Sequence, residues 1–419
     1  MPTAEVLSQG DEVVTGQITD TNAAWISEYL TTLGFTIMHH VGVGDRLPDL
    51  VRALQTISER SDLCVCTGGL GPTDDDLTAN AVAEAFARPL QLDEEALTQL
   101  EAKYARFGRE MARVNERQVW LPRGATRLDN DRGTAPGFAF TERDALFVCL
   151  PGVPREMEAM FEEGVLPLLR ERFQLQPARL VTLRCVGVGE SDLQQALGDL
   201  QAPGLTVSFR TKLPENHLKL RFDPEISTEA LVEIVESTLD RVGRWVFTVE
   251  GSPVPLPGFD TGGGHHASAV GRLIAARGHT LSTAESCTGG RIAAACTAIP
   301  GASAWFTEGV ITYANAAKVR LVGVSEALLR EHGAVSEPVA RQMASGVRQR
   351  AGTTWGIGVT GVAGPGGGSV DKPVGLVHVA IEGPGGCTHR QLRLPGDRDQ
   401  VQQLSVAAAL EMLRRRLLA

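Results

Sequence analysis

Apolar and polar positions change their period several times along the first 170 residues. Between short apolar runs, apolar residues return at helical spacing, as in Thr21–Leu33, which precedes Gly34 at the place where helices commonly end. The runs predict strands at Glu5–Ser8, Thr36–Val41, Leu63–Thr67 and Ala145–Leu150, and further helices at Leu47–Ser58 and Asp76–Phe86. Strands that alternate with helices indicate a parallel sheet covered on both faces, and thus a three-layer α/β/α domain.

The pattern changes after residue 172. Strands are expected in Leu180–Gly189 and Thr206–Phe222, and helices at Ser191–Leu200 and Ser227–Val242, which together form a small α+β unit without clustered reactive groups. Prolines and then glycines dominate the next stretch, a composition typical of linkers. We therefore expect a first domain at 1–172, a small α+β domain at 173–250, a linker at 251–268 and a C-terminal α/β domain at 269–419.

Two adjacent histidines, His265 and His266, lie in the expected linker. They could bind a metal, but a histidine pair in a flexible segment is more often solvated, and we favour that interpretation. The C-terminal domain should then begin with a helix at Ala267–Arg277.

Composition excludes several classes of function. The net charge of −10 and the aromatic content of 5% argue against sequence-independent binding of nucleic acid, which needs cations and stacking side chains. The N-terminus lacks the pattern of a signal peptide, and no apolar run approaches the roughly 20 residues that span a bilayer. Seven cysteines without a metal-binding pattern indicate reduced thiols. We expect a cytoplasmic protein that does not bind membranes.

The loop Thr67–Thr78 has more glycines and aspartates than any other loop of the first domain. Its glycines allow amide groups to approach a ligand, and the following helix directs its positive dipole end to the same place. The run Asp74–Asp76 supplies hard oxygen ligands that suit Mg²⁺ with a bound phosphate. In the alternative interpretation, one aspartate caps the helix and the others face water.

The C-terminal domain carries two small-residue turns with a serine each, Thr283–Gly290 and 300–303, followed by Lys318. A serine hydroxyl needs a neighbouring base to act as a nucleophile, and burial can make a lysine neutral enough to serve. An amidase is therefore one hypothesis. The alternative is that Ser286 and Ser303 are turn residues and Lys318 is a solvated surface charge.

Seven blocks in the C-terminal domain resemble the nicotinamide-nucleotide amidohydrolase family. They are Thr283–Gly290, Gly301–Phe306, Val310–Lys318, Gly333–Ser336, Thr360–Gly368, Lys372–Gly375 and Gly396–Asp399. The resemblance implies deamidation of nicotinamide mononucleotide to nicotinate mononucleotide and ammonia by a Ser/Lys dyad. The sequence of this domain has no cluster of metal-ligating residues, so we expect its chemistry to need no metal. The dyad maps onto Ser303 and Lys318, with Ser286 as the rival nucleophile.

The same resemblance assigns further roles around the dyad. Glu285 and Thr288 would hold the substrate or orient the lysine, and Tyr313 and Thr360 match polar positions of the family site. Amides of the segment from Gly361 through Gly364 to Gly368 could form an oxyanion hole. Arg398 suits a substrate phosphate, although an ion pair with a neighbouring aspartate is an equal alternative.

The first domain resembles molybdopterin-binding domains through its Thr-Gly-Gly-x-Gly loop and aspartates, and the whole chain resembles the CinA family of competence/damage-inducible proteins. For this domain the resemblance implies hydrolysis of ADP-ribose with Mg²⁺ or another divalent metal. The candidates are Asp11, Glu12, Asp74, Asp75 and Asp76 for the metal, Gly68, Gly69, Gly71 and Thr73 for phosphate, and Asn22 and Glu156 for a ribose or base.

Two alternatives remain open at this stage. The first domain could bind a molybdopterin or a nucleotide without turnover, or the chain could be an interaction protein in competence or recombination with vestigial sites. The middle domain resembles a KH-type module but lacks a Gly-x-x-Gly loop, so we expect it to dimerise the protein rather than bind RNA. The expected partners are small nucleotides and a second copy of the chain.

Overall fold

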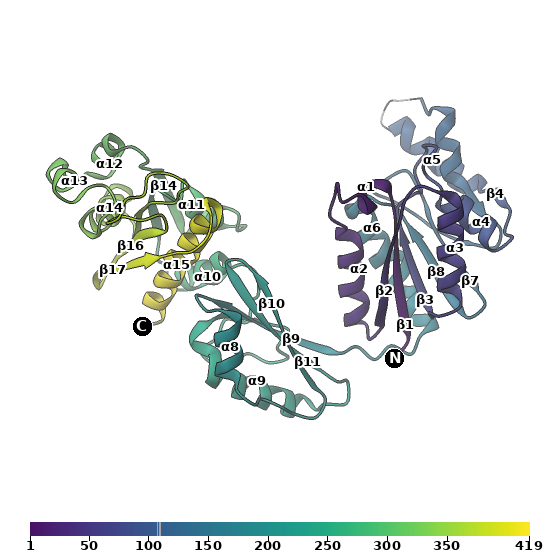
Figure 1. The fold of residues 1–419 in the computed structure, drawn as a ribbon, viewed down its shortest axis with the longest axis horizontal. Coiled ribbons are helices and arrows are strands. Elements are labelled where there is room, and N and C mark those ends of the chain that lie inside the picture. Colours follow the sequence, from purple (N-terminus) through teal and green to yellow (C-terminus); the bar gives the residue numbers. More distant parts are fainter. Residues whose placement is uncertain (107, 109) are drawn as a thin grey trace. The chain divides into compact units, whose positions relative to one another are not determined.

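The computed structural model describes residues 1–106, 108 and 110–419 of the 419-residue chain. These residues form two compact units, Met1–Ala178 and Arg179–Ala419, and each unit is described by itself (Figure 1). Among the described residues, no helix has the length and apolar character needed to cross a membrane.

The first unit is built on a six-stranded sheet with the order β2-β1-β3-β8-β7-β6, in which the first four strands are parallel. The last two strands, β7 and β6, are antiparallel additions at one edge. The strands are β1 (Thr3–Gln9), β2 (Thr36–Val43), β3 (Leu63–Thr67), β6 (Thr126–Leu128), β7 (Gly137–Glu142) and β8 (Ala145–Leu150).

Helices cover both faces of this sheet, as Figure 1 shows. Val65 of β3 packs in a core with Ile26 and Leu30 of α2, whereas Cys64 and Cys66 of β3 pack with Leu54 of α3 on the other side. The predicted three-layer α/β/α fold is confirmed. The helices are α1 (Asp11–Val14), α2 (Thr21–Thr32), α3 (Leu47–Ser58), α4 (Thr78–Ala85), α5 (Glu94–Arg106), α6 (Pro154–Met160) and α7 (Leu166–Arg172), with short helical turns at Arg113–Val119 and Phe161–Val165 and a small ribbon of β4 (Leu90–Leu92) and β5 (Trp120–Pro122).

The second unit begins with a four-stranded antiparallel sheet of the order β10-β11-β9-β12. Two helices on one face close its core, and the chain order β-α-β-β-α-β is that of a split β-α-β arrangement. The predicted α+β class is confirmed. The elements are β9 (Arg179–Val186), α8 (Glu190–Leu197), β10 (Leu205–Lys212), β11 (Glu215–Phe222), α9 (Thr228–Val242) and β12 (Val246–Glu250).

A five-stranded sheet of the order β14-β13-β15-β16-β17 follows, in which β14, β13 and β15 are parallel. Its two faces pack separate cores, one with α10, α11 and α15 and the other with α12 and α14. The elements are α10 (His266–Ala276), β13 (Leu281–Glu285), α11 (Arg291–Thr297), β14 (Phe306–Ile311), α12 (Asn315–Val322), α13 (Glu326–His332), α14 (Glu337–Ala351), β15 (Trp355–Gly361), β16 (Leu376–Gly383), β17 (Gly386–Arg393) and α15 (Arg398–Leu418).

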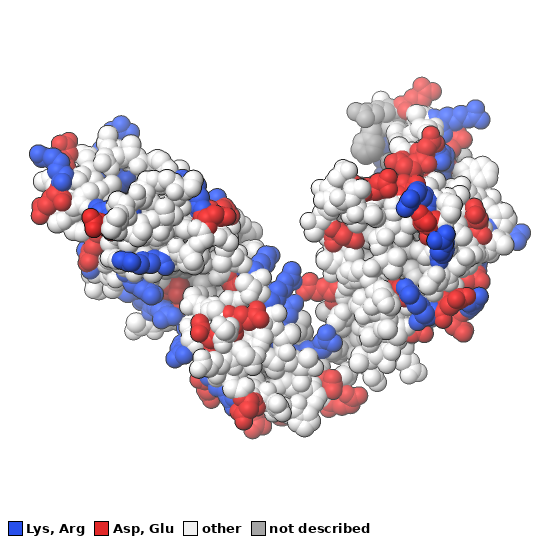
Figure 2. Space-filling view, viewed as in Figure 1, with Lys and Arg blue, Asp and Glu red and all other residues white. Residues whose placement is uncertain are grey.

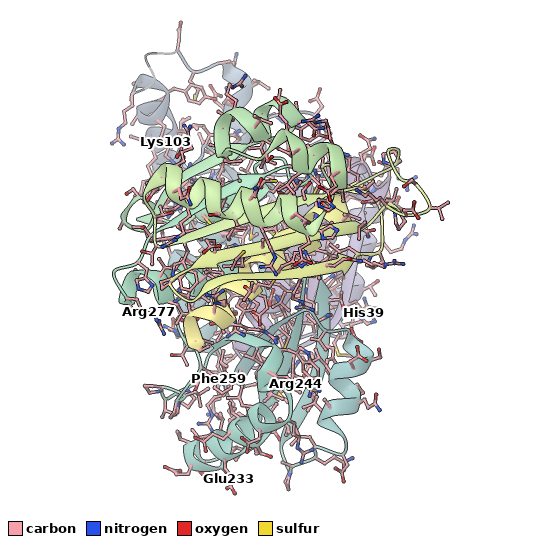
Figure 3. The ribbon with its side chains drawn as sticks, turned by 90° about the vertical axis from the view of Figure 1, so that its left-hand side faces the viewer. His39, Lys103, Glu233, Arg244, Phe259 and Arg277 are labelled. Carbon is pink, nitrogen blue, oxygen red and sulfur yellow. The ribbon has the colours of Figure 1, made fainter. Side chains whose placement is uncertain are left out.

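Several residues of the expected linker 251–268 are held in place by contacts. Phe259, labelled in Figure 3, packs with the core of the four-stranded module, and Asp260 accepts two hydrogen bonds from Arg272 of α10. The prediction of a solvated histidine pair is wrong for His266, which is 5% exposed and stacks on Phe247 of β12.

Acidic and basic side chains are interspersed over the face drawn in Figure 2. The charges are divided unequally between the units, however. Residues 1–178 contain 28 acidic and 16 basic residues, a formal charge of −12, which leaves +2 for residues 179–419 out of the total of −10. The two units therefore offer different electrostatic surroundings to a ligand.

Candidate active sites

Ser286 and Lys318 meet at the carboxyl ends of the parallel strands in the five-stranded sheet. Ser286 follows β13, and Lys318 lies in the first turns of α12, shortly after β14. Because β13 and β14 are parallel neighbours, their carboxyl ends lie at the same edge. The Lys318 Nζ atom lies 3.0 Å from the Ser286 Oγ atom, although 32 residues separate the two in sequence.

The surroundings of Lys318 suit a neutral amine. Its side chain is 1% exposed, and its Nζ atom lies 2.8 Å from the carbonyl oxygen of Thr312 and 3.3 Å from that of Tyr313. A neutral amine has two N–H groups for these two carbonyls and one lone pair, which would then face the hydroxyl of Ser286. Burial lowers the pKa of Lys318 below its usual 10.5, and no carboxylate forms an ion pair with it among the described residues. The lysine can therefore accept a proton from the serine.

The prediction that Ser303 pairs with Lys318 is wrong. Ser303 lies in a short helical turn, Ala302–Ala304, immediately before β14, whereas Lys318 follows the same strand. The six residues of β14 span roughly 20 Å at about 3.3 Å per residue, so Ser303 and Lys318 lie at opposite ends of this strand. Ser303 is exposed on the surface there.

Glu285 does not face a substrate, contrary to the expectation for this residue. Its side chain is fully buried, and its carboxylate accepts hydrogen bonds from the backbone N–H groups of Gly290, Ile292 and Ala293 at 2.8–3.0 Å. These donors form the first turn of α11, where a carboxylate is favourable. Glu285 thus fixes the loop that carries Ser286. Thr288, in this loop, is also buried, and its hydroxyl has no partner among the described residues.

A cavity of about 540 Å³ lies beside this site, between α15 and the loop after β15. Arg398 lines it and donates to the Gly364 carbonyl at 2.7 Å and to the Tyr313 hydroxyl at 3.0 Å. Its hydrogen bonds thus connect three predicted positions, and the alternative of an ion pair with a neighbouring aspartate is not what the structure has. Instead, Asp399 pairs with Arg291, a cation of the same cavity that the sequence interpretation missed.

Two further predicted residues contribute to the backbone around the site. The Thr360 hydroxyl donates to the carbonyl of Ala334 at 2.8 Å, which ties the end of β15 to the start of α14. Gly361 lies so close to β16 that a Cβ atom there would stand 2.7 Å from the Leu376 carbonyl oxygen. The amide of Ser286 itself donates to the carbonyl of Val359, so a donor for an oxyanion must come from elsewhere. An oxyanion hole in the glycine-rich loop stays a prediction.

The first unit has its own cavity, of about 420 Å³, at the carboxyl ends of its parallel strands. Six carboxylates and no Lys or Arg belong to its described lining. The carboxylates are those of Glu12, Asp20, Asp45, Asp75, Asp76 and Glu156. A phosphate can bind here only if a cation accompanies it, because six negative charges would otherwise repel it.

The predicted metal-binding carboxylates do not form one cluster. Asp74 turns away to pair with Arg117. Asp11 is not in the cavity lining; its carboxylate accepts from the backbone N–H of Asp45, and its own N–H donates to the Asp45 carboxylate. Asp76 accepts from the amide and hydroxyl of Thr73, which it holds in a turn. No group of three ligating side chains that could hold a metal occurs in the described chain. Of the five candidates, only Glu12, Asp75 and Asp76 line the cavity, and metal binding by them stays a prediction. The Thr73 hydroxyl donates to Asp76.

The loop after β3 needs glycines, because its backbone lies very close to neighbouring residues. Gly68 has a φ of 98°, and a Cβ atom there would lie 2.5 Å from the Gln9 carbonyl oxygen; Gly69 also has a positive φ, of 67°. At Gly71, a Cβ atom would lie 2.5 Å from the Asp76 carboxylate. The loop therefore keeps its backbone open to the cavity only as long as these positions lack side chains.

Three polar atoms of the first cavity are buried without a partner among the described residues. They belong to Asn22 (Oδ1), Ser8 (Oγ) and Gln118 (Oε1), all in the cavity lining. The Asn22 amide group donates to Thr67 and Gly152, which leaves its oxygen free, and Glu156 accepts from Asn130. Buried unpartnered acceptors indicate a ligand with hydrogen-bond donors. Gln118 was not predicted, because a distant turn brings it to the loop.

Fold and sites together define a two-unit α/β protein with an acidic ligand cavity in one unit and a buried serine–lysine pair in the other. Comparisons with known proteins agree with this division. Residues 5–171 match the family described as probable molybdopterin binding domain, and residues 264–417 match the CinA C-terminal domain.

The similarity extends over the whole chain. A competence-damage inducible protein of Symbiobacterium thermophilum is 45% identical over 99% of both chains, and a CinA-like protein of Geobacter metallireducens is 42% identical over 99% of both. A solved competence/damage inducible protein from Agrobacterium tumefaciens is 42% identical, covers 37% of this chain and 96% of its own, and has a TM-score of 0.35. The chain therefore belongs to the CinA family, as its sequence motifs predicted.

Proposed function

We propose that the second unit is a serine amidohydrolase in which Ser286 is the nucleophile and Lys318 the general base. The observation that carries the proposal is the 3.0 Å contact between the Lys318 amine and the Ser286 hydroxyl, in a site where the amine has a lowered pKa. A neutral lysine beside a serine satisfies the geometric and the protonation requirement for activating the hydroxyl.

The proton movements follow from this pair. Lys318 takes the Ser286 proton as the oxygen attacks a carboxamide carbon, and the resulting ammonium returns the proton to the nitrogen, which leaves as ammonia. Water then attacks the acyl-enzyme ester and gives a proton to Lys318. Collapse releases a carboxylate, and the Ser286 oxygen recovers its proton.

The substrate that best suits the surroundings is nicotinamide mononucleotide. Arg398 and Arg291 line the adjacent cavity, and guanidinium groups bind phosphate through paired hydrogen bonds. Gln402 of the same cavity donates to the carbonyl of Cys287, next to Ser286, so the cavity adjoins the reacting serine. A carboxamide at Ser286 and a phosphate at Arg398 would occupy both ends of one molecule.

The direct test is to incubate the full-length protein with nicotinamide mononucleotide and to measure ammonia and nicotinate mononucleotide. We expect both products in equal amounts, without an added metal. Nicotinamide riboside, which lacks the phosphate, should react more slowly. Release of nicotinamide instead of ammonia would overturn the assignment, because it would mean cleavage of the glycosidic bond.

For the first unit we propose hydrolysis of the pyrophosphate of ADP-ribose with a divalent cation. The described residues do not offer a complete metal cage, but Mg²⁺ is commonly bound by one or two carboxylates together with substrate phosphates. Asp75 and Glu12, which line the cavity, would hold it there. The cation would neutralise the phosphates in a cavity without Lys or Arg among its described lining, and Asn22 and Gln118 would accept from donors of the ligand.

Binding without turnover is the second candidate for this unit. It is favoured by the free acceptors of Asn22 and Gln118, which suit a nucleotide or a pterin ligand equally well. Measuring AMP release from ADP-ribose with and without Mg²⁺ separates the two. Binding of ADP-ribose without any AMP would support the binder.

A further inference from the structure

A third cavity, of about 280 Å³, lies in the second unit and shares Arg291 with the cavity beside Ser286. Its walls come from the turn between β10 and β11, the start of α10, the helix α11 and the middle of α15. Most of the lining is apolar and includes Ala298, Val406 and Leu410. A cavity of this size and apolar character suits a ligand about as large as one or two fused rings.

Two buried polar side chains line this cavity with unused hydrogen-bonding capacity. Glu215 is 8% exposed, and its Oε2 atom alone accepts from Arg184 and contacts His217; no described residue donates to its Oε1 atom. His266 is 5% exposed, and neither of its two ring nitrogens has a hydrogen-bond partner among the described residues. Buried polar groups are rarely left without partners, so His266 indicates a ligand, and the cavity-lining Glu215 offers that ligand a second acceptor.

The contacts of His266 define which hydrogen bond is missing. Its Nε2 atom lies 3.3 Å from an oxygen of Glu411, whose pKa is held at about 2 because interactions with His266 and Arg414 outweigh the effect of burial. In the neutral tautomer that places its proton on Nε2, facing this carboxylate, the Nδ1 atom keeps a lone pair. In that tautomer, Glu215 Oε1 and His266 Nδ1 can each accept a hydrogen bond.

The charges around the cavity are already compensated. Glu215 pairs with Arg184, Glu411 with Arg414 and Arg415, and the cavity-lining Arg291 with Asp399. A charged ligand would lose its hydration in this apolar space, and an anion would have to compete with Asp399 for Arg291. A neutral ligand would avoid this cost.

We propose that this cavity binds a neutral, planar heterocycle that carries two N–H donors, one for Glu215 Oε1 and one for His266 Nδ1. The chemical class includes cyclic ureas and the lactam edges of nucleobases. The site is separate from the Ser286–Lys318 pair, although α11 adjoins both the cavity and the loop that Glu285 fixes. The proposal does not depend on the reaction catalysed by either unit.

The probe for the test is 2-benzimidazolone, a neutral bicyclic molecule with two ring N–H groups, and indole, with one, serves as its comparator. Binding to the full-length protein is followed by saturation-transfer NMR at pH 7.5. We expect 2-benzimidazolone to bind with a dissociation constant of about 1 mM or tighter, as is typical of ligands of this size. Indole should bind several-fold more weakly.

Two variants place the probe in this cavity. Ala298→Phe fills it and should abolish saturable binding, whereas Ala294→Phe, at an exposed position of α11 outside the lining, should bind like the wild type. His266→Phe keeps a flat ring but removes the acceptor, and should weaken 2-benzimidazolone about fivefold while it leaves indole unchanged.

The results that overturn the proposal are equally specific. Absence of saturable binding at 10 mM 2-benzimidazolone would refute the site. Equal binding by wild type and Ala298→Phe would place the probe elsewhere in the protein. If His266→Phe weakened the binding of both probes to the same extent, the assigned hydrogen bond would be wrong. If His266→Phe was unfolded, the test would rest on Ala298→Phe, and binding of 2-benzimidazolone by that variant would show that the cavity is wrong.

Discussion

The two candidate active sites of this protein use charge in opposite ways. The second unit buries one amine, Lys318, and withdraws it from carboxylates, so its protonation is set by desolvation. The first unit arranges six carboxylates around an open cavity and has no cation in the described lining. In the second unit one buried lysine supplies the base, so no other residue can replace it. In the first unit several carboxylates can contribute to binding of a cation, so the loss of one leaves the others. Changes in the second unit should therefore be all-or-none and changes in the first graded.

The largest effect should come from the nucleophile. Ser286→Ala should lower the rate of ammonia release from nicotinamide mononucleotide by roughly 10⁴-fold or more, because no other hydroxyl contacts Lys318 among the described residues. Ser303→Ala is the matched control and should keep wild-type turnover. The opposite ranking of the two variants would show that the Ser286–Lys318 contact is not the catalytic one.

The general base should come next. Lys318→Ala should lose about 10²–10⁴-fold in kcat. In the wild type, only the neutral amine is active, so kcat/KM should rise with pH and level off above the lowered pKa of Lys318, with a midpoint below 10.5. A pH–rate profile checks this. A midpoint at or above 10.5 would contradict a desolvated lysine.

The first unit should respond to chelation and more gradually to mutation. EDTA should stop AMP release from ADP-ribose and leave deamidation unchanged. Asp75→Asn should slow the first reaction roughly 100-fold, by analogy with the removal of other charge-stabilising groups. Asp74→Asn changes a carboxylate that pairs with Arg117 outside the cavity and should be nearly silent. Loss of both reactions with EDTA would remove the contrast between the sites.

A smaller effect is expected at the phosphate subsite. Arg398→Gln should raise KM for nicotinamide mononucleotide about 10–100-fold and change kcat little, because a charge-assisted phosphate contact contributes to binding of substrate and transition state alike. Arg393→Gln, an exposed residue of β17, is the control. A fall in kcat with an unchanged KM would instead place Arg398 in the chemical step.

Assembly should have the smallest effect on activity. The strand β10 is an edge strand of the four-stranded sheet, and a second copy could cover such an edge. We expect light scattering to give about twice the chain mass of 44.7 kDa at micromolar concentration. A monomeric mass with full deamidase activity would show that neither site needs a partner.

The sequence by itself determined most of the architecture. A short apolar run located β3 at Leu63–Thr67, because a strand buried on both faces is apolar throughout. Apolar residues at helical spacing located α3 at Leu47–Ser58, because the burial of one face imposes its period on a helix. The glycine loop after β3 was placed at the cavity for the same reason, since loops after parallel strands share one edge. These features depend on local spacing, and local spacing can be read from a sequence.

The pairing of catalytic residues was decided only by the tertiary structure. Ser303 lies 15 residues from Lys318 and Ser286 lies 32 residues away, yet Ser286 is the one in contact. The reason is strand direction: residues that follow two parallel strands meet, whereas a residue that precedes one of them lies a strand length away. Long-range packing likewise buried His266 against Phe247 and turned Asp74 out of the cavity. Sequence separation carries no information on which edge of a sheet a side chain reaches, and the fold alone supplies it.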